Sequence, residues 1–211
     1  MKLNMLKIDG GKAGSIDVSD KIMGLKINHK LVKYVIDWQL NHLKPRTAKT
    51  KQRNEIRGST KKIYAQKGTG QARHASKKAP LFIGGGIAHG PKGKVYKVKK
   101  INKKVRKLAL AQTLSKKNKD KQLYILEDVK KEIKKTKDFN KFLTENKISN
   151  VLIVSDKNSV KNFTRSARNI KNLKIINEEG ANIYDMLKFK NVIITSSSMK
   201  KIEERILNEK N

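Results

Sequence analysis

Hydrophobic residues recur at two characteristic spacings in the second half of the chain. Four short runs rich in β-branched residues are typical of buried strands: residues 123–126, 151–154, 173–176 and 191–195. Between and after them, apolar residues recur every three or four positions, as on one face of a helix, around residues 139–143, 160–170, 183–187 and 199–206. Strands that alternate with helices predict a mostly parallel sheet covered on both faces, a three-layer α/β/α domain of the Rossmann-like kind.

Two longer helices are predicted nearer the N-terminus. Residues 28–43 carry apolar side chains at helical spacing, with Asn28 as a suitable N-cap. This helix should end before Pro45, because the residue before a proline avoids the α region. A second helix is predicted over residues 101–117, and its other face is basic, with Lys103, Lys104, Arg106 and Lys107.

Residues 45–97 follow neither spacing. Ser, Thr, Gly, Lys and Arg dominate this segment. A structureless segment longer than about 12–15 residues is either functional or disordered. We therefore predict a globular α/β domain made of residues 1–44 and 98–211, which begins with short strands at residues 2–8 and 15–18. Residues 45–97 are predicted to form a long extended basic loop inserted into it.

The charge of the chain changes this picture most. The 211 residues carry a net charge of +33, and between Lys44 and Lys119 there are 24 Lys or Arg and a single acid, Glu55. Unpaired like charge destabilises a compact state, so this segregation indicates one surface dedicated to a polyanion. Nucleic acid is the first candidate and an anionic membrane surface the second. A protein that only compacts DNA would not need an elaborate α/β domain.

Composition argues against a membrane-spanning protein, a secreted protein and a protein held by cysteine chemistry. No apolar run approaches the roughly 18–20 residues that span a bilayer, and the N-terminal residues lack the apolar stretch of a signal peptide. The chain has no cysteine, which excludes disulfides and cysteine-ligated zinc. We expect a soluble cytosolic protein.

Motifs for nucleotide binding or catalysis fit poorly. GTGQAR (68–73) has Arg73 where the dinucleotide pattern needs glycine, and GPKGK (90–94) lacks the Walker A spacing. The four histidines show no metal-ligand spacing. The serines at 196–198 are explained by helix capping. Asp156, after a strand, is interpreted as a polar turn, with a catalytic carboxylate as the less favoured alternative. We predict no cofactor and no metal of the protein's own.

The basic segment has too few apolar residues to fold by itself. Ordering each residue costs about 1–2 kcal/mol of backbone entropy, so contacts from outside must compensate. RNA would supply them. Lys and Arg would bind phosphates, Tyr64 and Phe82 would stack on unpaired bases, and glycines would allow close approach.

One run in this segment also resembles a known family. GSTKKIYAQKGTGQARHASKKAPLFIGGGIAHGPK (58–92) holds a K-G-T-G-x-A-R core, a following basic patch with Pro80, and G-G-G-x-x-x-G-P. The next helix, KKVRKLALAQTLS (103–115), matches as well. Over essentially its whole length the chain resembles the bacterial form of the universal large-subunit ribosomal protein four family.

The resemblance implies a structural component of the large ribosomal subunit, cytoplasmic and not an enzyme. It implies that the loop runs through 23S ribosomal RNA and supports early assembly, and that Mg²⁺ enters only through the RNA. Neighbouring large-subunit proteins and the nascent peptide would be further partners, with no membrane and no small-molecule substrate. The tip that lines the exit-tunnel constriction would be Gln66, Lys67, Gly68, Thr69, Gly70 and Gln71.

Charge, aromatic residues and resemblance together predict a set of residues that contact ribosomal RNA. They are Lys44, Arg46, Lys49, Lys51, Arg53, Arg57, Lys61, Lys62, Tyr64, Lys67, Arg73, His74, Lys77, Lys78, Phe82, Gly84, Gly85, Gly86, His89, Lys92, Lys94, Lys103, Lys104 and Arg106.

Three positions depart from the family pattern. Ala65, Gln71 and Ile83 stand where relatives often have arginine. Because lysine is a point charge without the planar fork of arginine, we expect affinity carried more by the number of charges than by bidentate contacts. An alternative function is an RNA-modifying or nucleotide-dependent enzyme that grips RNA with the basic loop. Its one glycine-rich candidate near a strand is DGGKAG (9–14), which lacks a fitting spacing.

Overall fold

The computed structural model describes all residues except 9–10, 94–98, 129–134, 147, 157–165 and 208–211. Residue contacts divide the chain into two compact units. The first, Met1–Leu40 with Lys100–Asn211, is called the globular unit here, and the second, Asn41–Lys99, is called the hairpin unit.

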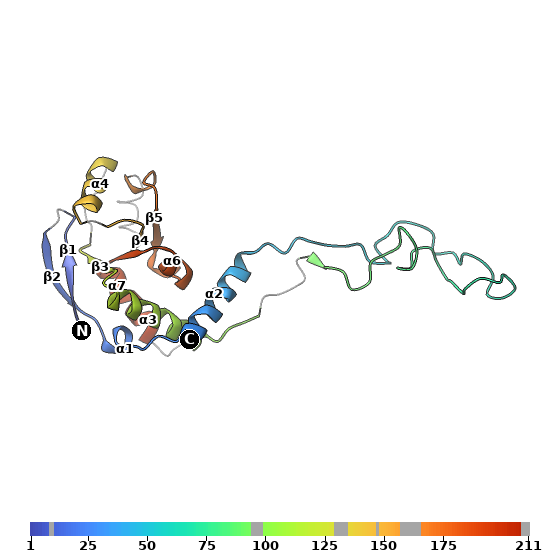
Figure 1. The fold of residues 1–211 in the computed structure, drawn as a ribbon, viewed down its shortest axis with the longest axis horizontal. Coiled ribbons are helices and arrows are strands. Elements are labelled where there is room, and N and C mark those ends of the chain that lie inside the picture. The colour runs from blue at the N-terminus through green and yellow to red at the C-terminus, as the bar shows by residue number, and fades with distance from the viewer. Residues whose placement is uncertain (9–10, 94–98, 129–134, 147, 157–165, 208–211) are drawn as a thin grey trace. The chain divides into compact units, whose positions relative to one another are not determined.

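A six-stranded mixed sheet organises the globular unit, in the order β2-β1-β3-β6-β4-β5 (Figure 1). The edge strand β2 pairs antiparallel with β1, and the pairs β1–β3, β3–β6, β6–β4 and β4–β5 are parallel. The strands are β1 (Lys2–Leu6), β2 (Lys12–Asp17), β3 (Leu123–Leu126), β4 (Val151–Ser155), β5 (Leu173–Asn177) and β6 (Asn191–Thr195). The α/β class and the mostly parallel pairing agree with the sequence pattern.

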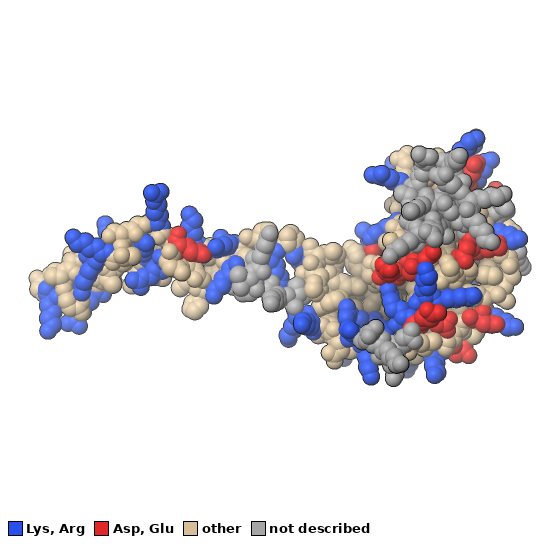
Figure 2. Space-filling model, turned by 180° about the vertical axis from the view of Figure 1, so that it is seen from behind, with Lys and Arg blue, Asp and Glu red and all other residues tan. Residues whose placement is uncertain are grey.

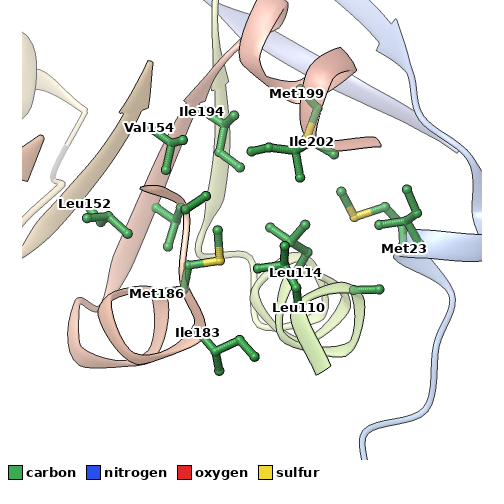
Figure 3. Close-up of a cluster of buried hydrophobic side chains, with 14 of the residues drawn as sticks. Met23, Leu110, Leu114, Leu152, Val154, Ile183, Met186, Ile194, Met199 and Ile202 are labelled. Atoms are coloured by element: carbon green, nitrogen blue, oxygen red, sulfur yellow. The ribbon is translucent and has the colours of Figure 1, made fainter. Parts of the chain in front are cut away.

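The central strands bury side chains on both faces, and the two-residue period of a strand sorts them into two clusters. Leu152 and Val154 of β4 belong to one cluster, with Leu114 and Met186 (Figure 3). Ile153, between them in sequence, belongs to the second cluster, where Phe139, Phe142 and Leu143 pack. This two-sided burial explains why the strands are continuous apolar runs in the sequence.

The helices agree closely with the predicted ranges. They are α2 (His29–Leu43), α3 (Lys103–Lys119), α4 (Thr136–Glu145), α6 (Ile183–Lys188) and α7 (Ser196–Leu207). Asn28 is confirmed as the cap of α2, because its Oδ1 accepts hydrogen bonds from Lys30 N at 3.1 Å and Leu31 N at 3.3 Å. The short helix α1 (Asp20–Met23) and the 3₁₀ turn η2 (Glu178–Gly180) were not predicted. Most of the helix predicted over residues 160–170 lies outside the described residues.

A buried lysine joins the end of α3 to the turn before β6. Lys117 is 5% exposed. Its Nζ donates to Gln122 Oε1 at 2.9 Å and to the carbonyl oxygens of Phe189 at 2.9 Å and Lys190 at 2.8 Å. Burial lowers the pKa of Lys117, since desolvation disfavours the charged form. Three acceptors for three ammonium hydrogens compensate that burial.

The hairpin unit consists of two arms paired by backbone hydrogen bonds. Lys49 and Lys92 form an isolated antiparallel bridge. Further along, Ile87 N donates to Lys51 O at 3.0 Å and Ile63 N to Ala75 O at 3.1 Å. No apolar side chain is buried in the part of this unit that the structure describes. Its arms are therefore held by the backbone, without a hydrophobic core.

Candidate nucleic-acid interface

Three glycines of the hairpin unit lie against its own chain. A Cβ added at Gly86 would lie 2.3 Å from Arg53 N, one at Gly85 would lie 2.0 Å from Ala79 O, and one at Gly90 would lie 2.0 Å from Thr50 Oγ1. Real Cβ atoms essentially never approach so closely, so a side chain at Gly86 or Gly90 would force the arms apart, and one at Gly85 would distort the turn over residues 79–85. The hairpin therefore needs glycines for close contacts within its own chain. Sequence reasoning had assigned close approach at glycines only to contact with RNA.

The glycines of the predicted tunnel tip behave differently. Gly68 has φ +82° and Gly70 has φ +65°, and a Cβ at either would meet nothing within 4 Å. All six residues from 66 to 71 are exposed. Gly84, the first of the triplet, is also exposed with φ +81° and open space around it. These glycines are needed for left-handed turns, which L side chains rarely adopt.

The two aromatic residues predicted to stack on bases pack against a histidine. His74 lies edge-on to Phe82, with ring centroids 4.9 Å apart, and edge-on to Tyr64 at 6.3 Å. The Tyr64 hydroxyl donates to the carbonyl oxygen of Ala72. The three rings are half-buried, so they link neighbouring turns of the hairpin and keep part of their surface open.

The predicted cations of the hairpin unit face solvent, as Figure 2 shows along its length. Lys78 is half-buried, Lys94 lies outside the described residues, and the exposed ones are Lys44, Arg46, Lys49, Lys51, Arg53, Arg57, Lys61, Lys62, Lys67, Arg73, Lys77 and Lys92. The one acid, Glu55, pairs with Lys49 at 2.9 Å, and the hydrogen bond from Lys49 lowers the pKa of Glu55. The surface is therefore almost purely cationic, which suits a polyanion.

The predicted RNA-binding cations of helix α3 differ in their surroundings. Lys103 and Lys104 lie exposed in its first turn. Arg106 instead places its guanidinium over the ring of Trp38 on α2, 5.1 Å from the centroid, and its Nε is buried without a hydrogen-bond partner. Arg106 thus has a packing role between two helices, which its place in a basic run did not indicate.

The two alternative sites considered from the sequence are a catalytic carboxylate at Asp156 and a phosphate loop at residues 9–14. Asp156 accepts a hydrogen bond from Lys201, which also donates to Glu178 Oε1 at 3.2 Å. These two carboxylates raise the pKa of Lys201. Residues 12–14 of the glycine-rich candidate belong to β2, which pairs antiparallel with β1, so this segment leads into a strand and not into a helix that could hold a phosphate.

The serines after β6 begin helix α7, as predicted, but the acceptor at this helix end is a residue that sequence reasoning missed. Asp128 Oδ1 accepts from Ser197 N at 3.1 Å and from Ser197 Oγ at 2.9 Å, and Oδ2 accepts from Ser196 Oγ at 2.9 Å. A carboxylate is favourable at a helix N-terminus. Only the fold brings Asp128 there, since it follows a different strand.

The described residues lack the features of a metal site and of a membrane span. No group of three or more His, Cys, Asp or Glu in this part of the chain is arranged to hold a metal ion. None of its helices combines the length and the apolar character needed to cross a bilayer.

Comparison with known proteins identifies the family. A family model described as the ribosomal protein L4/L1 family matches residues 16–205. The chain belongs to this family. Large ribosomal subunit protein uL4 of Pelagibacter ubique is 50% identical over 206 residues, which cover 97% of this chain and 99% of the relative. The uL4 proteins of Hyphomonas neptunium and Rhodospirillum rubrum are each 38% identical over 206 residues, which cover 97% and 98% of this chain and 96% and 100% of theirs. The resemblance read from residues 58–92 is confirmed.

Proposed function

We propose that the chain is a structural component of the large ribosomal subunit that binds 23S ribosomal RNA through residues 45–97. The observation that carries this proposal is the hairpin unit's lack of any buried apolar side chain in its described part, combined with its exposed cations. Such a segment gains little free energy from its own contacts. Phosphates that pair with its cations supply the missing contribution.

The tip, residues 66–71, is proposed to line the nascent-peptide exit tunnel. Membership of the family supports this assignment. So does the geometry of the tip, whose glycines form left-handed turns with open space around them. Lys67 is exposed there. The nascent peptide and neighbouring large-subunit proteins are the corresponding protein partners, and the site of action is the ribosome in the cytoplasm.

The globular part, proposed as residues 1–44 and 98–211, is a three-layer Rossmann-like domain that serves as an RNA-binding body and has no catalytic role. Its relatives are named as ribosomal proteins. Two carboxylates near the carboxyl edge of its sheet are engaged internally, Asp128 by α7 and Asp156 by Lys201. No cofactor is proposed beyond Mg²⁺ bound by the RNA, and support of early assembly follows from the large cationic surface.

Affinity is proposed to depend on the number of charges. Ala65, Gln71 and Ile83, where relatives often have arginine, are all exposed. A phosphate contact in this hairpin would therefore come largely from lysines, which neutralise charge without a shaped fork. The slope of binding affinity against salt concentration should accordingly be steep.

Sedimentation tests the proposal directly. A lysate of the source cell is washed at high salt and sedimented through a sucrose gradient, and the protein is located by mass spectrometry. Stoichiometric retention in the large subunit is expected, since specific contacts outlast the screening of non-specific ones. Release into the soluble fraction would reject a structural role and favour the enzyme alternative.

A further inference from the structure

An open groove of about 770 Å³ lies within the hairpin unit. Its lining comes from both arms, with Gln52, Arg53 and Asn54 on one arm and Ile87, Ala88 and His89 on the other. All its lining residues belong to the described part of the chain. Its volume is in the range of about 300–1,000 Å³ that is typical of pockets for single small molecules.

The groove combines three chemistries that a nucleotide requires. Arg53, Lys78 and Lys92 supply cations for a phosphate. Pro80, Ile87 and Ala88 supply an apolar surface for the face of a base. Amide groups of Gln52 and Asn54 are able both to donate and to accept at a base edge.

Backbone contacts fix the walls of the groove. Gly86 N donates to Lys78 O at 3.0 Å, and Ile87 N donates to Lys51 O at 3.0 Å. Gly86 also packs so closely on Arg53 that a Cβ would lie 2.3 Å from Arg53 N. Arg53 and Lys78 are thereby held beside the stretch of chain that carries Ile87 and Ala88.

His89, at the groove, has a left-handed backbone with φ +55°. Non-glycine residues adopt this conformation uncommonly, although histidine does so more often than most. Such conformations are frequent at ligand-binding positions. Here the conformation sets the path of the arm between Ala88 and Gly90. A Cβ added at Gly90 would lie 2.0 Å from Thr50 Oγ1.

We propose that the groove receives a single unpaired nucleotide of the ribosomal RNA, extruded from its stack. This inference rests on the proposed function and adds the class of RNA element that the hairpin recognises. A regular duplex would offer phosphates to Arg53, Lys78 and Lys92, but its stacked bases would leave the apolar surface uncovered. Proteins that bind unpaired nucleotides combine a cationic groove for the backbone with a surface on which the bases stack.

Ala88→Trp tests the proposal, because it fills the groove and leaves every charge in place. Ala88 lines the groove and is exposed, so a larger side chain there disturbs no packed core. Ala65→Trp is the matched control, since Ala65 is exposed in the same hairpin and outside the groove. Each full-length protein is bound to deproteinised 23S ribosomal RNA. Dimethyl sulfate then probes unpaired adenines and cytosines, a carbodiimide probes unpaired uracils and guanines, and hydroxyl radicals probe the backbone.

The wild-type protein and Ala65→Trp are expected to protect one or a few unpaired bases that Ala88→Trp leaves reactive. The backbone footprint should be shared by all three, and affinity should fall by no more than about tenfold, because one nucleotide is a small part of the phosphate contacts. Identical base reactivities for wild type and Ala88→Trp, with the footprint intact, would overturn the groove assignment alone. Absence of any footprint with the wild-type protein would overturn the proposed function and this inference together.

Discussion

The two units of this chain are stabilised by different kinds of contact. In the globular unit, Leu114, Phe139 and Ile153 are fully buried against both faces of a sheet. In the hairpin unit, the large apolar residues Leu81 and Ile83 are exposed at 78% and 107%. One unit therefore has a hydrophobic core, and the other depends on backbone pairing and closely packed glycines. The large apolar side chains of the hairpin unit are therefore available for contact with another molecule.

Deletion of residues 49–95 is the strongest test of this comparison. The deleted chain should still unfold cooperatively on heating, because the hairpin contributes no buried apolar side chain in its described part. It should lose nearly all of its affinity for 23S ribosomal RNA, because the deleted residues include the proposed contact surface and a third of the net charge, 12 Lys or Arg against one Glu. Circular dichroism and filter binding measure the two effects. Loss of cooperative unfolding would show that the units depend on each other for folding.

Truncation of a leucine in the globular unit should lower the free energy of unfolding much more than truncation of a leucine in the hairpin unit. Leu114→Ala is expected to lower the free energy of unfolding by about 2–5 kcal/mol, through lost burial and the cavity left behind. Leu81→Ala, its matched control in the hairpin unit, should change it by less than about 0.5 kcal/mol. Urea unfolding measures both. Equal effects would mean that the hairpin has a core of its own.

Replacement of the buried Lys117 should lower the free energy of unfolding by an intermediate amount, and this amount should depend on pH. Lys117→Met leaves the carbonyl oxygens of Phe189 and Lys190 without this donor and should cost about 1–3 kcal/mol. Burial places the folded-state pKa of Lys117 below its ordinary value of 10.5. Between these two values the unfolded state binds more protons, so wild-type stability gains with rising pH.

The stability difference between wild type and Lys117→Met should therefore widen as the pH is raised toward 10.5. Because every other lysine is common to both proteins, their titration cancels in the comparison. Urea unfolding at a series of pH values measures it. A difference that narrows over that range would contradict the depressed pKa.

Gly86→Ala should disturb the hairpin unit without affecting the globular one. The added Cβ would collide with Arg53 N, so the bonds from Gly86 N to Lys78 O and from Ile87 N to Lys51 O should weaken. Hydrogen exchange at these amides should accelerate, with global stability unchanged. Gly180→Ala is the control, since a Cβ there meets nothing within 4 Å. Unchanged exchange in Gly86→Ala would mean that the arms are not held together this way.

Reversal of one tip charge should have the smallest effect on assembly. Lys67→Glu leaves most of the 24 cations between Lys44 and Lys119 in place, so incorporation into the large subunit should persist. Changes should appear at the tunnel, measured as altered nascent-peptide crosslinking to residues 66–71. Failure of this variant to enter ribosomal particles would refute the tip assignment.

Much of the globular unit was predictable because its signals are local. Strands such as Val151–Ser155 are buried on both faces and read as continuous apolar runs, and Asn28 caps α2 as its residue type suggests. The short helix α1 was missed because its four residues carry too little periodicity. Arg106 was assigned to RNA from its basic neighbours, whereas its stacking on Trp38 depends on how α2 meets α3.

The α/β class, the segregation of charge and, through residues 58–92, the family were predicted from the sequence alone. These properties follow from residue types and short spacings, and both can be recognised without knowledge of the folded structure. The tertiary structure decided which glycines contact their own chain, which cations are engaged, and that Asp128 meets the start of α7. These are contacts between residues far apart in sequence, and only the folded path of the backbone brings such residues together.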